Sequence, residues 1–86
     1  MANNTQILPA GDRWYIAVSG EAAGWLFGAT ANPANMLRSF EPTIIGVKAP
    51  TSSKIAVYIA APTEAIAMER VQNAVNKAMQ QYGWME

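Results

Sequence analysis

The sequence predicts an α+β domain in which an antiparallel-rich sheet is covered on one face by helices. Three observations predict this class: two apolar segments joined by a short turn, a long segment with apolar residues at helical spacing, and a short alternating segment. They occupy residues 43–61, 63–82 and 13–19 of the 86-residue chain. A chain of this length forms one domain with a modest core. We expect that domain to span residues 12–86 and to follow an N-terminal arm, residues 1–11.

Three segments are predicted strands. Arg13–Ser19 alternates large apolar residues with smaller or polar ones, as a strand with one buried face does. Thr43–Ala49 and Lys54–Ala61 are rich in Ile and Val. The turn-forming residues 50–53 separate these two segments, so we expect them to form a hairpin.

The stretch between the first strand and the hairpin has two interpretations. Trp25-Leu26-Phe27 lies between two glycines and fits a second strand, which gives the element order β-β-α-β-β-α. Ala22–Ala29 fits a glycine-weakened helix equally well. Asn32-Pro33 then predicts a helix start, with Asn as the N-cap and Pro at the first helical position. A short helix over Pro33–Phe40 follows from this signal.

The last predicted helix is amphipathic. Thr63 can cap its N-terminus, and Glu64 complements the positive end of its dipole. Gly83 is expected to end it. The predicted apolar stripe consists of Met68, Val71, Val75, Ala78 and Tyr82, widened by Ile66, Ala67, Ala74 and Met79.

The composition argues against catalysis. The chain has no Cys and no His, and only 14% of its residues are charged. Disulfides and thiolate metal sites are excluded, and the side chain that most often titrates near neutral pH is missing. Six Lys and Arg balance six Asp and Glu, so no basic surface for nucleic acid is expected. We therefore expect a protein that is not an enzyme and has no cofactor, metal site or catalytic residues.

The sequence predicts neither secretion nor membrane insertion. The N-terminus lacks a basic region followed by an apolar run, as a signal peptide would have. The longest apolar run, Ile55 to Pro62, is too short to span a bilayer. We therefore expect a cytoplasmic protein with no membrane partner.

The same composition predicts self-association. Hydrophobic residues make up 51% of the chain and the formal net charge is zero, which favours association. Monomers rarely expose an apolar patch above roughly 600 Å². We expect aromatic side chains to be covered by another copy of the chain or by another protein, and the aromatic interface candidates are Tyr58, Trp25 and Trp84.

Residues 36–67 have the sequence MLRSFEPTIIGVKAPTSSKIAVYIAAPTEAIA. The pattern combines a cation at the end of a short helix, the strand Thr43-Ile44-Ile45-Gly46, a small-residue hairpin loop, an apolar strand and an Ala-rich helix. It resembles the bacterial microcompartment shell domain over less than half the chain. A circularly permuted form of that family, like ferredoxin-like domains in general, is compatible with the expected element order.

The resemblance implies a cyclic assembly that tiles into a flat layer. In such an assembly Arg38 would lie at a lateral contact between rings. The hairpin loop would line a central opening, with Thr51, Ser52, Ser53 and Lys54 as its residues.

These observations give a leading hypothesis and two alternatives. The leading hypothesis is a non-enzymatic, homo-oligomeric structural or interaction subunit, with a shell-like cyclic assembly as its most concrete form. The first alternative is a small binding or inhibitor protein, of the kind mobile genetic elements encode, that masks a partner protein. The second is a small-ligand sensor with pockets between subunits, in which Lys48, Lys54 or Arg70 would bind an anionic group.

Overall fold

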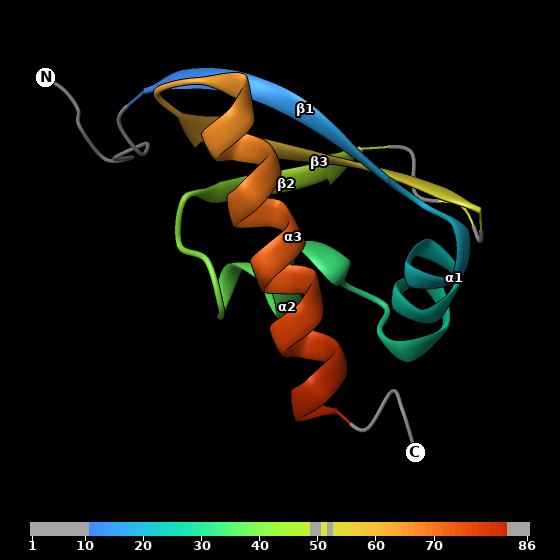
Figure 1. Cartoon of the computed structure of the whole chain (residues 1–86). Coiled ribbons are helices and arrows are strands. Elements are labelled where there is room, and N and C mark those ends of the chain that lie inside the picture. Colours follow the sequence, from blue (N-terminus) through green and yellow to red (C-terminus); the bar gives the residue numbers. More distant parts are fainter. Residues whose placement is uncertain (1–10, 49–50, 52, 83–86) are drawn as a thin grey trace, which may run out of the picture.

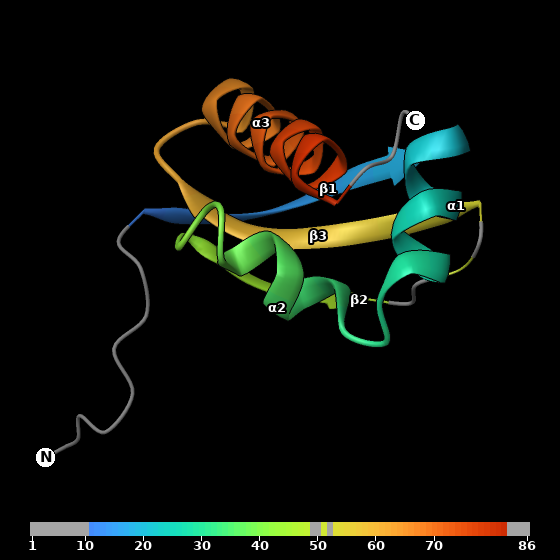
Figure 2. The same cartoon turned by 90° about the horizontal axis from the view of Figure 1, so that it is seen from below.

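A computed structural model describes residues 11–48, 51 and 53–82 of the chain. Their elements are β1 (Asp12–Ser19), α1 (Gly20–Ala29), α2 (Pro33–Arg38), β2 (Ile44–Lys48), β3 (Lys54–Ala61) and α3 (Glu64–Gln81). The strands of this described part form one antiparallel sheet in the order β1-β3-β2, and the helices lie on one side of it (Figure 1, Figure 2). The predicted α+β class is confirmed. Apart from Gly11, the predicted N-terminal arm lies outside the described residues.

Strand β3 is the centre of the sheet because both other strands pair with it. Its alternate residues Ile55, Val57 and Ile59 are fully buried beneath the helices. On one side Val47 of β2 lies opposite Val57, which is the predicted hairpin pairing. On the other side of β3, Ile16 of β1 also lies opposite Val57. The alternation of Arg13–Ser19 and the Ile- and Val-rich segments around the turn therefore predicted these strands correctly.

The second strand predicted around Trp25 is not present, because this segment forms α1 and the element order is β-α-α-β-β-α. The chain leaves β1 at Gly20, whose φ of +69° suits glycine and strains other residues. In the helix, Ala23 and Leu26 lie three residues apart on one side and are both fully buried. Phe27 faces outward and is 48% exposed. A strand would instead have placed Trp25 and Phe27 together, opposite Leu26.

Helix α2 begins where the sequence predicts. The Asn32 side chain accepts a hydrogen bond of 3.1 Å from the backbone N–H of Asn35, and Pro33 is the first helical residue. The helix ends at Arg38, two residues earlier than expected. Leu37 is its fully buried residue, so this short helix closes the core beside β2.

Helix α3 is the predicted long helix, capped by Thr63, whose hydroxyl accepts from the N–H of Ile66 at 3.2 Å. The buried stripe differs from the prediction because Met68 and Tyr82 are 54% and 57% exposed. The buried residues of the helix are Ala67, Val71, Ala74, Val75 and Ala78. Small side chains thus face the sheet and let the helix approach it closely. Met68 lies at the margin of the stripe, beside β1.

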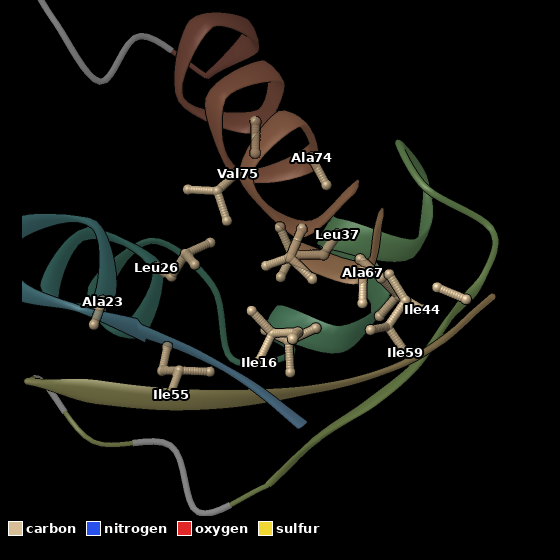
Figure 3. Packing of buried hydrophobic residues seen from close by; sticks show 14 residues of the cluster. Ile16, Ala23, Leu26, Leu37, Ile44, Ile55, Ile59, Ala67, Ala74 and Val75 are labelled. Carbon is tan, nitrogen blue, oxygen red and sulfur yellow. The ribbon is translucent and has the colours of Figure 1, made fainter. Parts of the chain in front are cut away.

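The core is aliphatic and lies between the sheet and the helices. Figure 3 shows Ile16 and Ile55 from the sheet, Leu26 and Leu37 from the two short helices, and Val75 from α3 pointing into one cluster. No polar or charged residue of the described part is buried. Burial of apolar area therefore supplies the main stabilisation. Within the same residues, no helix combines the length and apolarity that crossing a bilayer requires.

Replacing Leu26 by Ala tests the helical packing of α1. Leu26 has no exposed surface, so its truncation leaves a cavity and is expected to lower the free energy of unfolding by about 2–5 kcal/mol. Phe27→Ala, at the next position, is the matched control and is expected to cost no more than about 1 kcal/mol. Urea denaturation followed by circular dichroism measures both. A larger cost at Phe27 than at Leu26 would contradict the assigned orientation of the helix.

Candidate interaction surface

The two edges of the sheet are β1 and β2, and the hydrogen bonds of β3 show which backbone groups of β1 face outward. The N–H of Ala60 donates to the carbonyl of Thr43 at 3.1 Å, on the β2 side. The carbonyl of Lys54 accepts from Thr51 on the same side, at 2.9 Å. Along a central antiparallel strand, the N–H and C=O of one residue point to one neighbouring strand, and those of the next residue point to the other. Lys54 and Ala60 point to β2, so the odd-numbered residues of β3, among them Val57, point their peptide groups to β1.

The pairing register between β3 and β1 shows which peptide groups of β1 point to β3 and which point outward. Val57 lies opposite Ile16, so the peptide groups of Ile16 point into the sheet. Residues one position away on either side point the other way. The outward-facing residues are Arg13, Tyr15, Ala17 and Ser19. Their N–H groups, and the carbonyls of Arg13, Tyr15 and Ala17, form a row along the free edge, where no other strand of the described residues lies. The carbonyl of Ser19 is taken up by α1, because Ser19 is the N-cap of that helix.

The other edge, β2, is partly closed. Its pairing with β3 shifts between Ile44 and Gly46, and such an irregularity twists an edge away from new partners. Arg38 covers the start of the strand: Nε donates to the carbonyl of Ile44 at 3.1 Å and Nη2 to that of Ile45 at 2.7 Å. The third donor, Nη1, binds Oδ1 of Asn35 at 2.8 Å. The guanidinium thus joins α2 to β2 and occupies two carbonyls at this edge, whereas the peptide groups of Val47 face outward.

By contrast, β1 has none of the features that protect a sheet edge. It is eight residues long, contains no proline, and pairs with β3 in one continuous register. Its charged residues, Asp12 and Arg13, lie at the first two positions only. Natural proteins rarely leave a long, regular and uncharged edge unpaired, because such an edge accepts strands from other chains.

A groove runs beside this edge. It has a volume of about 320 Å³, at the small end of the range for ligand sites. Its lining residues are Ile16, Ala17, Val18 and Ser19 of β1, Ala22 of α1, and Met68, Val71, Gln72 and Val75 of α3. The α3 residues share one helix face. Ser19 and Gln72 are the only polar side chains in this lining, but polar atoms contribute as much of its exposed surface as apolar atoms do. The groove therefore offers both polar and apolar contacts next to a free strand edge.

No helix or strand of the described residues covers the face of the sheet opposite the helices, which we call the uncovered face. The rings of Tyr15 and Tyr58 stack there, with centroids 4.6 Å apart and planes at 22°. The Nζ of Lys48 lies 5.4 Å from the centroid of Tyr15, as in a cation–π contact. Strand alternation places Arg13 and Lys54 on the same face. This face is therefore aromatic and positively charged.

The structure distributes the predicted interface residues over different places. Tyr58 is on the uncovered face, half-buried beside Tyr15. Trp25 is half-buried and packs against the core from α1. Arg38 forms the edge contacts described above. Trp84 lies outside the described residues. The structure therefore does not gather these residues into one patch.

The loop that was predicted to line a central opening is a turn whose described residues hydrogen-bond to one another. The hydroxyl of Thr51 accepts from the N–H groups of Ser53 and Lys54, at 3.3 and 3.0 Å. Ser52 lies outside the described residues. Two of the cations suggested for an anionic ligand, Lys48 and Lys54, are exposed on the sheet face, whereas Arg70 donates to the carbonyl of Ala60 at 3.1 Å. None of these residues lines the groove.

Sequence reasoning did not identify the groove. Its position depends on which strand lies at the edge, and strand order does not follow from local patterns. One signal was present: the middle of Arg13–Ser19 lacks the Lys, Pro or bulge that protects an edge. In the described residues, no group of three or more Asp or Glu side chains is placed to hold a metal ion.

The chain matches no protein-family model, and no curated protein or solved structure is significantly similar to it. The resemblance to a microcompartment shell domain therefore stays a prediction.

Arg38→Lys tests the role of this residue in the fold. Lysine cannot make the guanidinium's separate bonds to two carbonyls, so we expect the free energy of unfolding to fall by about 1–2 kcal/mol. Lys77→Gln, at an exposed cation of α3, is the control and is expected to be nearly neutral. Chemical denaturation gives the stability, and light scattering gives the assembly mass. If Arg38→Lys dispersed an assembly without lowering stability, the lateral-contact hypothesis would be favoured instead.

Proposed function

We propose that this chain is a non-enzymatic interaction subunit that associates with copies of itself. The observation that carries the proposal is the regular edge of β1 beside a groove. The opposite edge is interrupted by a register shift and partly covered by Arg38, so the two edges of one small sheet differ in their capacity to bind a strand. The difference supports an association surface on the β1 side.

The energetics favour strand pairing at this edge. Each hydrogen bond added contributes about 0.5–1.5 kcal/mol net. Apolar area removed from water in the groove adds about 25 cal/mol per Å², before the cost of association. The formal net charge of zero adds no long-range repulsion between copies.

The uncovered sheet face is less suited to packing against its own copy. Arg13, Lys48 and Lys54 lie on it, which is half of the chain's six Lys and Arg. Asp12 is the only acidic residue of the three strands, and strand alternation places its side chain on the face opposite that of Arg13. Two such faces would repel each other if they met directly. Edge pairing avoids this contact because it places the faces side by side.

The finer fold assignment, a ferredoxin-like domain, is also part of the proposal. That fold has the order β-α-β-β-α-β. If α1 and α2 are counted as one helical connection, this chain has the first five of these elements within its described residues. A right-handed connection through α3 would bring the sixth element, a fourth strand, next to β1 and antiparallel to it. The groove lies at that position.

A shell-like cyclic assembly is the narrower form of this proposal, and it has less support. It needs Arg38 at a contact between rings, but the guanidinium donors already bind three acceptors in the same chain. Interaction through β1 does not require Arg38.

Light scattering of the purified chain at a series of dilutions tests the proposal. We expect a mass of at least twice the 9.3 kDa of one chain, because a single copy leaves the edge and the groove exposed. Mass action should shift the population toward single chains at the lowest concentrations. A mass of one chain throughout the series would overturn the proposed function.

A further inference from the structure

We infer that the interface has two-fold symmetry, with β1 pairing antiparallel to β1 of a second copy in a sheet that continues through both subunits. The inference rests on the proposed function and names the surface that performs it. An interface of this kind uses the same residues on both sides, so the strand must be complementary to itself. The hydrogen bonds of β1, its side chains and the neighbouring helix α3 all bear on this complementarity.

The outward backbone groups define a register. With Ile16 opposite Ile16 of the second copy, Arg13 lies opposite Ser19 of the second copy, and Tyr15 lies opposite Ala17. All four outward-facing residues then pair with outward-facing residues. The Tyr15–Ala17 pairs can each exchange two hydrogen bonds in an antiparallel ladder. In the Arg13–Ser19 pairs the N–H of Ser19 can donate, while its carbonyl stays bound to α1. A shift by one residue would place outward groups opposite inward ones and would reverse the faces, so it is excluded. Shifts by two residues leave outward groups unpaired at the ends.

The side chains fit this register on both faces. On the helix side, Trp14 lies opposite Val18 of the second copy, so the apolar row of β1 continues across the axis. On the other side, no charge meets a like charge. Arg13 lies opposite Ser19 of the second copy, which carries no charge.

Helix α3 contacts both β1 and β3 and lies on the β1 side of the sheet (Figure 2). Its residues Met68 and Gln72 line the groove beside β1. A strand of a second copy that pairs with β1 would lie next to this groove and would cover part of Met68, which is 54% exposed in the single chain.

A second copy fits better than an unrelated extended segment. The backbone row alone would accept any extended strand, because its hydrogen bonds carry little side-chain information. The self-complementary register, with Trp14 opposite Val18 and Arg13 opposite Ser19 of the second copy, is a property of this chain. It distinguishes a second copy from other partners.

The direct test is Ala17→Pro, with Ala17→Val as the matched control. Proline removes an N–H that points out of the sheet, so β1 can still pair with β3, and proline is tolerated at such edge positions. Valine keeps the N–H and suits a strand. We expect light scattering to show that Ala17→Pro halves the mass of the dimer, while Ala17→Val retains it. Circular dichroism should show that both variants remain folded.

The outcomes separate this inference from the function it rests on. If the original chain has the mass of one copy, both are overturned. If it associates and folded Ala17→Pro associates equally well, the β1 interface is overturned while the proposed function stands.

Cross-linking provides a second measurement that does not depend on how well the proline variant folds. Because the chain has no cysteine, a single introduced thiol reports one position. We expect a mixture of Tyr15→Cys and Ala17→Cys chains to form a mixed disulfide on oxidation, since these positions face each other across the axis. Phe27→Cys, on the outer side of α1, should form none. An associated protein without the mixed disulfide would overturn the β1 pairing, and efficient linking of Ala17→Cys to itself would overturn the register.

Discussion

Backbone polar groups at a sheet edge require partners, and this requirement distinguishes the two sides of the molecule. On the β2 side it is partly met within the chain, because the guanidinium of Arg38 binds the carbonyls of Ile44 and Ile45 beside a register shift. On the β1 side the chain supplies no strand among its described residues, and the peptide groups of residues such as Ala17 face outward. A small sheet with one interrupted edge and one regular, open edge has a preferred direction for association. The proposed function follows from this asymmetry.

The groove exists because α3 sits close to the sheet without covering its edge. Ala67, Ala74 and Ala78 face the strands, so the helix can approach them closely. A helix with larger side chains at these positions would stand farther from β1. Val71 and Val75 then form the wall of the groove, and Met68 stands at its rim. The same small residues that stabilise the helix–sheet layer therefore also shape the surface offered to a partner.

The aromatic residues contribute differently from the expectation based on composition. Trp14 packs against the core and its indole N–H donates to the carbonyl of Ala61 at 3.0 Å, so it ties the two strands together. Trp25 also packs against the core. The exposed large apolar residues of the described part are Tyr15, Phe27, Met68 and Tyr82. The aromatic residues of the described part therefore do not form one exposed patch. The proposal of association depends on the geometry of the strands.

The sequence by itself determined the elements whose side chains have a strong period. The alternation of Arg13–Ser19 and Lys54–Ala61 and the Asn32 and Thr63 caps all depend on neighbours along the chain, so local chemistry was sufficient. It did not determine whether the Trp25 segment is a strand or a helix, since glycines and mixed apolar residues suit both. Only the tertiary structure decided this, by burying Ala23 and Leu26 on one side of α1. It also decided which strand is central and which edge stays open, because strand order depends on contacts between residues far apart in the sequence.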